Sequence, residues 1–258
     1  AAGPRQDPRH RHRPLPRILG AMSAPGDEPA GVLLVDKPQG LTSHDVVDRV
    51  RRLYRTRRVG HAGTLDPMAT GLLIVLVGRA TKASDQLMAQ DKEYLGEATL
   101  GVVTDTQDAE GATLETHPVP ALGEEQVRAA LASMLGDQLQ VPPMHSAKKI
   151  GGQKLYDLAR KGLESRATAG DQPRESRCFP GKAPGSTSAC AAPRALRADA
   201  RYDLGRKLGP GAHLSMLRRT RSGRLDVAQA RTLPQLGAMD AAQLLAALIP
   251  VAEATATA

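Results

Sequence analysis

One carboxylate stands out in the stretch RRVGHAGTLDPMATG, residues 57–71. Asp66 lies there among glycine, threonine and small apolar residues, five positions after His61 and directly before a proline. An aspartate side chain is ionised at neutral pH, and an ionised carboxylate can serve as the nucleophile of an enzyme. The simpler interpretation is a tight turn between two elements, because Gly, Asp and Pro are common in turns for conformational reasons alone. The surrounding sequence has to decide between the two.

The stretch is flanked by elements that could hold it in place. Residues 31–37 (GVLLVDK) and 72–78 (LLIVLVG) are apolar runs that predict buried strands. Between them, residues 44–54 place valines at helical spacing, and Ser43 or Thr42 can cap this helix. Asp66 therefore follows a helix and precedes a buried strand.

The rest of the chain alternates strands and helices irregularly. We expect helices over residues 80–90, 123–136, 202–209 and 226–233, strands over residues 92–101 and 213–223, and a polar turn over residues 104–111. The chain shows no internal repeat and no G-x-G-x-x-G after a strand. The pattern predicts an α/β protein built on a mixed sheet.

The formal charge of +8 comes from two segments. Residues 1–21 hold five Arg and one Asp, and residues 165–201 hold seven Lys or Arg and three Asp or Glu, so each contributes +4 and the remainder is neutral. Bulk charge is therefore no evidence for RNA binding.

Both cysteines, Cys178 and Cys190, lie in the second segment. The cysteine-free remainder fits a reducing cytoplasm and excludes a thiolate metal site or a cysteine nucleophile there. No apolar run approaches the ~20 residues of a membrane span.

Taken in order, five motifs resemble the bacterial TruB family of tRNA pseudouridine synthases. They are DKPQGLTSHDVV, RRVGHAGTLDPMATGLLIVLVGRATK, KEYLGEATLG with TDTQDAEG, VPPMHSAKKIGGQKLYDLARKG, and LGPGAHLSMLRRTRSGRLDVAQARTL. The likeness covers roughly residues 31–164 and 202–236, and its Gly-His-x-Gly-Thr-Leu-Asp block is the most specific part. The resemblance implies a mixed, largely antiparallel sheet of the pseudouridine synthase fold with flanking helices.

The resemblance also implies a reaction and the residues for it. The family isomerises uridine 55 in the T loop of tRNA by base flipping, with no metal and no cofactor. By this likeness Asp66 is the nucleophile, and Tyr94 stacks on the uracil and is a candidate to remove the proton from its C5. His61 matches the histidine that helps to displace the flipped nucleotide. An imidazole bonded to the turn backbone and an ordinary strand tyrosine are the structural alternatives.

Seven residues are expected to bind RNA on the same basis. His61 is one. Lys37 and Lys82 sit in matching loops, where they would hold phosphates, brace the aspartate loop or remain solvated charges. The segment HSAKKIGGQKLYDLARKG resembles the part of the family that grips the T arm, with Lys148, Lys149, Lys154 and Arg160 as phosphate contacts. We expect the RNA to be recognised by its folded shape and splayed bases.

The resemblance breaks between Glu164 and Tyr202. The family has a Cys-x-x-Gly-Thr-Tyr-(Ile or Val)-Arg motif there, whose arginine pairs with the catalytic aspartate. This chain has a Pro-, Ala-, Ser- and Arg-rich stretch without strand alternation. Back-translation of residues 184–201 in shifted frames gives Cys-Thr-Ala-Gly and then Tyr-Val-Arg-Thr-Leu-Ala. We therefore expect residues 165–201 to be out of frame and misfolded or disordered, with the catalytic arginine missing from the chain.

The expected organisation follows from these matches. Residues 1–21 are interpreted as disordered upstream sequence translated by mistake, with a basic RNA-binding arm as the alternative. Residues 22–236 form the catalytic domain, and residues 237–258 form a truncated stub that lacks the family's PUA-type domain. We expect a cytoplasmic monomer that acts on the T arm of tRNA. The rival function is a catalytically inactive tRNA-binding or tRNA-folding protein, because the arginine-bearing motif is lost.

Overall fold

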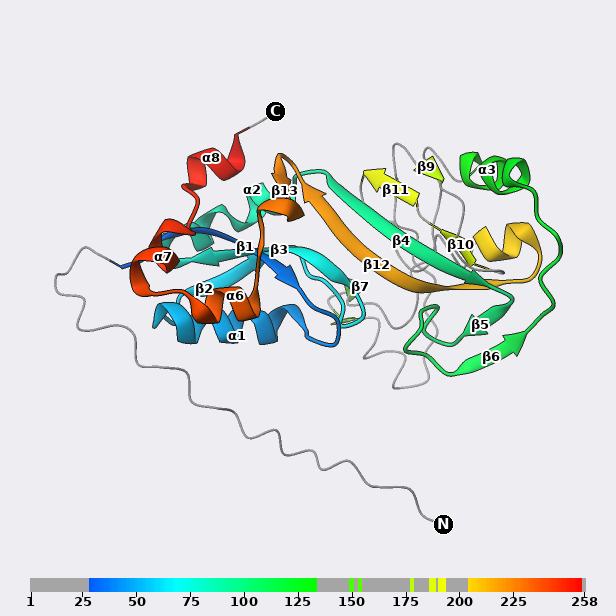
Figure 1. Ribbon diagram of the computed structural model, residues 1–258, viewed down its shortest axis with the longest axis horizontal. Coiled ribbons are helices and arrows are strands. Elements are labelled where there is room, and N and C mark those ends of the chain that lie inside the picture. The colour runs from blue at the N-terminus through cyan, green and yellow to red at the C-terminus, as the bar shows by residue number, and fades with distance from the viewer. Residues whose placement is uncertain are drawn as a thin grey trace, which may run out of the picture.

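A mixed sheet runs along the molecule, and helices flank its N-terminal strands (Figure 1). The computed structural model describes residues 28–133, 149–150, 153–154, 177–178, 186–188, 190–193 and 204–256. The strands are β1 (Gly31–Lys37), β2 (Val59–Ala62), β3 (Thr70–Val77), β4 (Lys92–Leu100), β5 (Val102–Thr104), β6 (Thr113–Thr116), β7 (Lys149–Ile150), β8 (Gln153–Lys154), β9 (Arg177–Cys178), β10 (Ser186–Ser188), β11 (Cys190–Pro193), β12 (Ala212–Ser222), β13 (Leu225–Asp226) and β14 (Arg231–Thr232). The helices are α1 (Ser43–Tyr54), α2 (Ser84–Met88), α3 (Glu124–Ala132), α6 (Leu233–Ala238), α7 (Ala241–Ala246) and α8 (Val251–Thr255), with short 3-10 turns η1 (Gly78–Ala83) and η2 (Val227–Gln229).

The main sheet has the strand order β14-β1-β3-β12-β4-β11-β9. Strand β2 also pairs with β3, β13 with β12, and β10 with β4. Among the described pairs, β14 on β1 and β12 on β3 are parallel and the others are antiparallel. The predicted mixed, largely antiparallel sheet with flanking helices is therefore confirmed.

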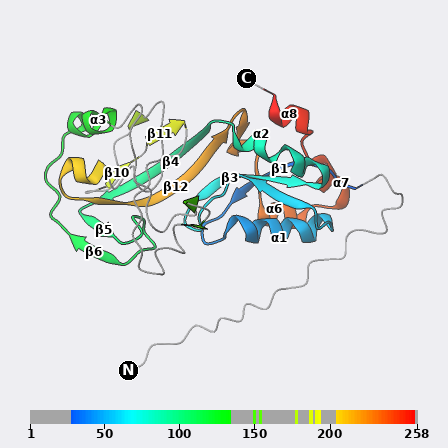
Figure 2. The same cartoon turned by 180° about the vertical axis from the view of Figure 1, so that it is seen from behind.

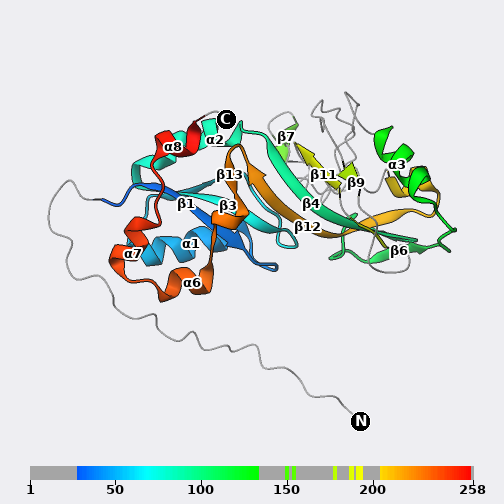
Figure 3. The ribbon, with the colours of Figure 1, turned by 45° about the horizontal axis from the view of Figure 1, so that its top comes forward.

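The core lies on both faces of β1 and β3. Alternate residues of β1 enter different clusters: Leu33 and Val35 pack on the side of α1, and Val32 and Leu34 pack on the side of α2 and α8. This alternation follows from the two-residue period of a strand. Figure 3 shows α2 and α8 on one side of these strands and α1, α6 and α7 on the other. Seven of the eight residues of β3 are buried, which explains its unbroken apolar sequence.

Helix α1 begins where the sequence predicts. Thr42 is the N-cap, and a capping box with Asp45 closes the first turn. Val46, Val47 and Val50 are buried against the sheet. The helix ends at Tyr54, and its C-cap Arg55 has a left-handed φ of 51°, which turns the chain back toward β2.

The C-terminal helices pack onto the same core. Tyr54 of α1 donates a hydrogen bond from its hydroxyl to the Leu244 carbonyl at 2.7 Å. Leu236 and Leu244 are buried in the α1-side cluster, and Val32 exchanges backbone hydrogen bonds with Ile249 at 2.8 Å in both directions. Residues 237–256 of the segment that we expected as a stub thus carry α7 and α8 and contribute to the core.

The helix expected over residues 226–233 is wrong. The structure has only η2 there, followed by β14, which pairs in parallel with Val35 and Asp36 of β1. Asp226 caps a single turn that Gln229 closes through its side chain, and Thr232 already caps α6. Residues 231–232 pair with β1, which is distant in the sequence, instead of continuing the predicted helix.

Beyond the core, β4 and β12 form a long ribbon that carries the outer part of the molecule (Figure 2). Two irregularities interrupt their register, between Leu214 and Met216 and between Arg219 and Arg221. All four residues of β6 are exposed. Strands β9, β10 and β11 fall within residues 165–201, and β10 and β11 pair with β4; the remaining residues of that segment lie outside the described part. No described helix is long and apolar enough to cross a membrane.

Candidate active site

The Asp66 loop, residues 63–69, connects β2 to β3. The two strands pair from Val59 opposite Val77 to Ala62 opposite Ile74. Gly63 starts the loop at φ 93°, a conformation that side chains rarely adopt. Leu65 and Met68 are buried on either side of Asp66, which is exposed. The apolar neighbours anchor the loop, so the carboxylate points out of the core.

Lys37 holds the loop from one side. Its side chain is fully buried at the end of β1, and its Nζ donates to the carbonyls of Leu41 at 2.6 Å, Pro38 at 3.1 Å and Pro67 at 3.3 Å. Burial lowers the pKa of Lys37, and the nearby Asp66 carboxylate opposes this shift. Of the roles considered for Lys37, this geometry favours bracing the loop over holding a phosphate.

Ser43, the first residue of α1, holds the same loop through two hydrogen bonds. Its Oγ donates to the Leu65 carbonyl at 3.0 Å and accepts from the Leu65 amide at 2.8 Å. Gly40 adds a backbone bond, its amide donating to the Pro67 carbonyl at 2.8 Å. Sequence reasoning treated Ser43 only as a possible helix cap. Because Thr42 makes that cap, the Ser43 hydroxyl is available to the loop.

Arg219 of β12 lies behind the loop, and sequence reasoning missed it. Only 2% of the residue is exposed, and its guanidinium donates to the carbonyls of Gly63 at 3.1 Å, Thr64 at 2.8 Å and Leu72 at 3.2 Å. Its Nε donates to the Tyr94 hydroxyl at 3.1 Å. The signal in the sequence was the strand alternation, which places Arg219 on the same inward face as Leu217, two residues earlier.

Tyr94 lies on β4 and contacts the same arginine as the loop. It is 7% exposed, and the guanidinium carbon of Arg219 lies 5.3 Å from the centre of its ring. The structure therefore brings together Asp66, Tyr94 and Lys37 from the expected set, with Arg219 joining the loop to the tyrosine.

His61 occupies the strand that leads into the loop. It is partly buried, and its Nδ1 has no hydrogen-bond partner in the described part of the chain. Burial lowers the pKa of His61, and the positive charges of His44 and Arg219 lower it further. The imidazole is therefore mainly neutral at pH 7.

The other expected RNA-binding residues lie away from the loop or outside the described part. Lys82 is exposed on η1. Lys149 and Lys154 occupy paired positions in the register of the short β7–β8 hairpin. Lys148 and Arg160 lie outside the described residues. In the part of the chain that is described, no group of three or more His, Cys, Asp or Glu could hold a metal ion.

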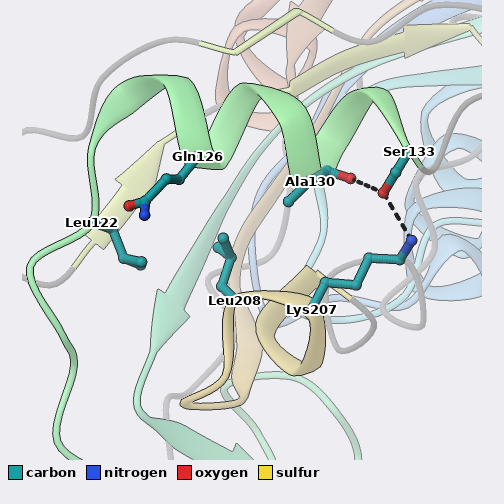
Figure 4. Close-up of a pocket in the computed structure, with 6 residues that line it drawn as sticks. All are labelled: Leu122, Gln126, Ala130, Ser133, Lys207 and Leu208. Atoms are coloured by element: carbon teal, nitrogen blue, oxygen red, sulfur yellow. Dashed lines mark hydrogen bonds between the residues drawn. The ribbon is translucent and has the colours of Figure 1, made fainter.

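A separate hollow of about 430 Å³ lies at the opposite end of the β4–β12 ribbon (Figure 4). It lies between α3 and the helical turn 204–208, where Lys207 Nζ donates to Ser133 Oγ at 2.8 Å. Its lining comes from six residues: Leu122, Gln126, Ala130, Ser133, Lys207 and Leu208. None of the expected catalytic residues contributes to it, so the hollow is not part of the candidate active site.

Two family models match the chain. The TruB family pseudouridylate synthase N-terminal domain matches residues 51–173, and the tRNA pseudouridylate synthase B C-terminal domain matches residues 201–255. The tRNA pseudouridine synthase B of Opitutus terrae is 46% identical over 243 residues, covering 90% of this chain and 98% of the relative. The protein of the same name from Chromohalobacter salexigens is 46% identical over 224 residues, covering 86% of this chain and 73% of the relative.

Solved structures agree on the fold. A crystal structure of a Cbf5–Nop10–Gar1 complex contains a chain that matches with a TM-score of 0.67 and 25% identity, covering 87% of this chain and 61% of that one. A chain of an archaeal box H/ACA Nop10–Cbf5 complex matches with a TM-score of 0.62 and 23% identity, and the match covers 88% of this chain and 62% of that one. This chain thus spans about three fifths of the length of these two chains.

Proposed function

Since the chain belongs to the TruB family of tRNA pseudouridine synthases, we propose that it converts uridine 55 of the T loop to pseudouridine, with Asp66 as the nucleophile. The observation that carries this proposal is the state of the Asp66 carboxylate. The carboxylate is exposed at the tip of a braced loop, and no described residue donates a hydrogen bond to it. It is therefore open to a substrate.

The proposed reaction needs a nucleophile, and an exposed carboxylate can supply one. The reaction breaks the N1–C1′ glycosidic bond and forms a C5–C1′ bond; the proton on C5 leaves and N1 gains one, so no atom is gained or lost. A nucleophile splits this rearrangement into two easier steps through a covalent intermediate. Attack of Asp66 on the sugar or on the base is compatible with its exposed position.

Tyr94 and His61 have supporting roles in the proposal. Base flipping costs a few kcal/mol of lost stacking, and stacking on an aromatic ring returns roughly 1–3 kcal/mol per base. Tyr94 is the ring beside the loop and the candidate to remove the C5 proton. His61, with a neutral imidazole at the start of the loop, is the candidate to displace the flipped nucleotide.

The T arm of tRNA is the proposed partner of the β7–β8 hairpin. The register places Lys149 opposite Lys154. Two lysines at paired positions of one hairpin supply positive charge that an RNA phosphate backbone can neutralise. Lys148 and Arg160 belong to the same proposed contact, which would recognise the folded RNA backbone rather than a base sequence.

The release of tritium from T-loop RNA labelled at C5 of the uridine tests the nucleophile. We expect Asp66→Asn to lower the rate by at least about 10³-fold, while tRNA binding in a filter assay stays within about threefold. Asp48→Asn, on the exposed side of α1 where Asp48 pairs with Arg51, is the matched control and should retain activity. Release by Asp66→Asn at the unaltered rate would refute the mechanism.

We also propose that the reading frame of residues 165–201 is shifted, because the back-translated sequence restores the arginine-bearing motif at its expected place. The frame-corrected chain should then release tritium faster than the printed chain. Resequencing of the gene tests the shift. An uninterrupted reading frame that encodes the given residues near Glu164, at residues 195–196 and before Tyr202 would contradict it. Binding of tRNA without tritium release by both chains would contradict the proposed enzyme activity itself.

A further inference from the structure

We infer that Arg219 is a positioning residue for the reaction: it fixes the Asp66 loop and Tyr94 in a single arrangement. This inference rests on the proposed function, because it takes Asp66 and Tyr94 as the groups that act on the uridine. Arg219 itself does not need to touch the substrate.

The hydrogen bonds of Arg219 join the start of the Asp66 loop to β3, the strand that follows the loop. Two acceptors, the carbonyls of Gly63 and Thr64, precede Asp66, and the third, the carbonyl of Leu72, follows it. A guanidinium has five N–H donors in a rigid planar fork, so one side chain can hold several acceptors at fixed relative positions. The start of the loop and the strand that follows it are thereby fixed to β12.

The same guanidinium joins the loop to Tyr94. Its Nε donates to the phenolic oxygen at 3.1 Å, and its carbon lies 5.3 Å from the ring centre. Tyr94 lies on β4 and Gly63 on the β2–β3 connection, so Arg219 links two strands of the sheet to the loop. A shift of Arg219 would change the distance between the proposed nucleophile and the proposed base.

The backbone of Arg219 reinforces this arrangement. Arg219 pairs with Gly71 across the parallel β3–β12 contact, and a Cβ added at Gly71 would clash with the Arg219 carbonyl oxygen. Gly71 also has a left-handed φ of 94°, which side chains rarely adopt. Both the close contact with Arg219 and this backbone conformation therefore require glycine. This glycine allows β12 to approach the end of the loop closely enough for the guanidinium to reach its carbonyls.

The charge of Arg219 has no carboxylate partner among the described residues; its donors face carbonyls and a phenol. Burying a charge away from a counter-ion is costly, and an apolar side chain of similar volume is often at least as stable. Stability alone therefore does not account for an arginine at this position. A requirement for several donors in fixed geometry does.

Arg219→Lys tests the inference, because it keeps the charge and loses the fork. We expect kcat for pseudouridine formation to fall by about 10–100-fold, since a small misplacement of reacting groups has effects of this size, while KM for tRNA changes by less than about threefold. Hydrogen exchange of residues 63–72 should become faster, which reports on the loop without using activity.

Arg218→Lys is the matched control. Arg218 is the adjacent residue of β12, and it makes a two-point ion pair with Asp36 at 2.8 and 2.9 Å. The same substitution there should leave kcat within about twofold and the exchange of residues 63–72 unchanged. An Arg219→Lys chain with unaltered kcat and unaltered exchange overturns the inference, as does an equal loss in both variants.

Tyr94→Phe separates the two links that Arg219 makes. If Arg219 acts partly through the phenolic oxygen, the double variant loses less activity than the product of the two single losses. A loss equal to that product overturns the link to Tyr94. If Asp66→Asn keeps full activity while Arg219→Lys still speeds the exchange of the loop and lowers kcat, the nucleophile is wrong and the positioning role stands.

Discussion

The Asp66 loop and the acidic turn, residues 104–112, both connect neighbouring strands, but they are held in opposite ways. In the acidic turn, Asp108 Oδ1 accepts from Thr106 Oγ1 at 2.6 Å and from the Glu110 amide at 3.0 Å, and Asp105 Oδ1 accepts from the Ala112 amide at 2.9 Å. The turn is closed mainly by its own carboxylates and backbone, and β12 adds one bond, from the Leu214 amide to the Gln107 carbonyl at 3.0 Å.

The Asp66 loop is held from outside. Within it, the described backbone contributes one hydrogen bond, from the Ala69 amide to the Asp66 carbonyl at 3.1 Å. Its other fixed points are the backbone bond from Gly40 and the side chains of Lys37, Ser43 and Arg219, which lie on three separate elements. A carboxylate that closes a turn has its oxygens occupied by N–H and O–H groups, whereas external bracing leaves the Asp66 carboxylate free for a substrate. The loop then depends on the rest of the fold for its shape.

The largest expected effect comes from removing the Lys37 brace. In Lys37→Met the carbonyls of Pro38, Leu41 and Pro67 lose a common donor. The Pro67 carbonyl keeps its bond from the Gly40 amide, so mainly the partly buried carbonyls of Pro38 and Leu41 are left unpaired. At about 1–3 kcal/mol for each unsatisfied acceptor, we expect the free energy of unfolding to fall by about 3 kcal/mol. Urea denaturation measures this loss, and hydrogen exchange should show faster opening of residues 63–69.

Asp108→Ala is the corresponding change in the self-closed turn. We expect a smaller loss of about 1 kcal/mol, with faster exchange confined to residues 104–112. If Lys37→Met leaves the exchange of the Asp66 loop unaltered, or if Asp108→Ala disturbs both loops, then the contrast between external and internal bracing is wrong.

This contrast also separates what could be predicted from the sequence from what could not. Periodicity predicted most of the described strands and helices near their observed ranges, and the resemblance pointed to Asp66, His61 and Tyr94, whose roles stay predictions. The acidic turn could be predicted from the sequence because its hydrogen bonds mainly join residues that are close together in the chain. Arg219 was missed because its partners lie 125–156 residues away along the chain, and a charged residue in a strand ordinarily faces water. The erroneous helix over residues 226–233 has a similar cause, since β14 exists only through its pairing with β1.

The neighbouring hydroxyls of Thr42 and Ser43 allow a second comparison, between a hydrogen bond within a helix cap and hydrogen bonds to the Asp66 loop. Thr42 caps α1, and Ser43 exchanges two buried hydrogen bonds with Leu65. We expect Ser43→Ala to cost about 2 kcal/mol of unfolding free energy and to lower kcat, because it frees the loop. Thr42→Ala should cost about 1 kcal/mol, the usual loss of a helix cap, with kcat retained.

Thermal denaturation and the tritium-release assay measure both variants in parallel. Thr42→Ala serves as the control for general destabilisation of α1, since it removes a hydroxyl one position away without removing a contact to the loop. An equal loss of kcat in the two variants would mean that the helix as a whole, rather than the Ser43 hydroxyl, controls the Asp66 loop.

The smallest expected effect is the pH dependence of His61, at the entry to the externally braced loop. Burial, then the charges of His44 and Arg219, lower the pKa of His61 in the folded chain. Because the folded pKa lies below that of the unfolded chain, the contribution of His61 to stability is fully present above about pH 6.5 and is lost as the pH falls through the lowered value. The free energy of unfolding should therefore decrease with acidification, and less steeply in His61→Asn. In an NMR titration, His44→Gln should raise the pKa of His61 toward its ordinary value. A His61 imidazole that already titrates at that value in the unaltered chain would contradict the electrostatic account.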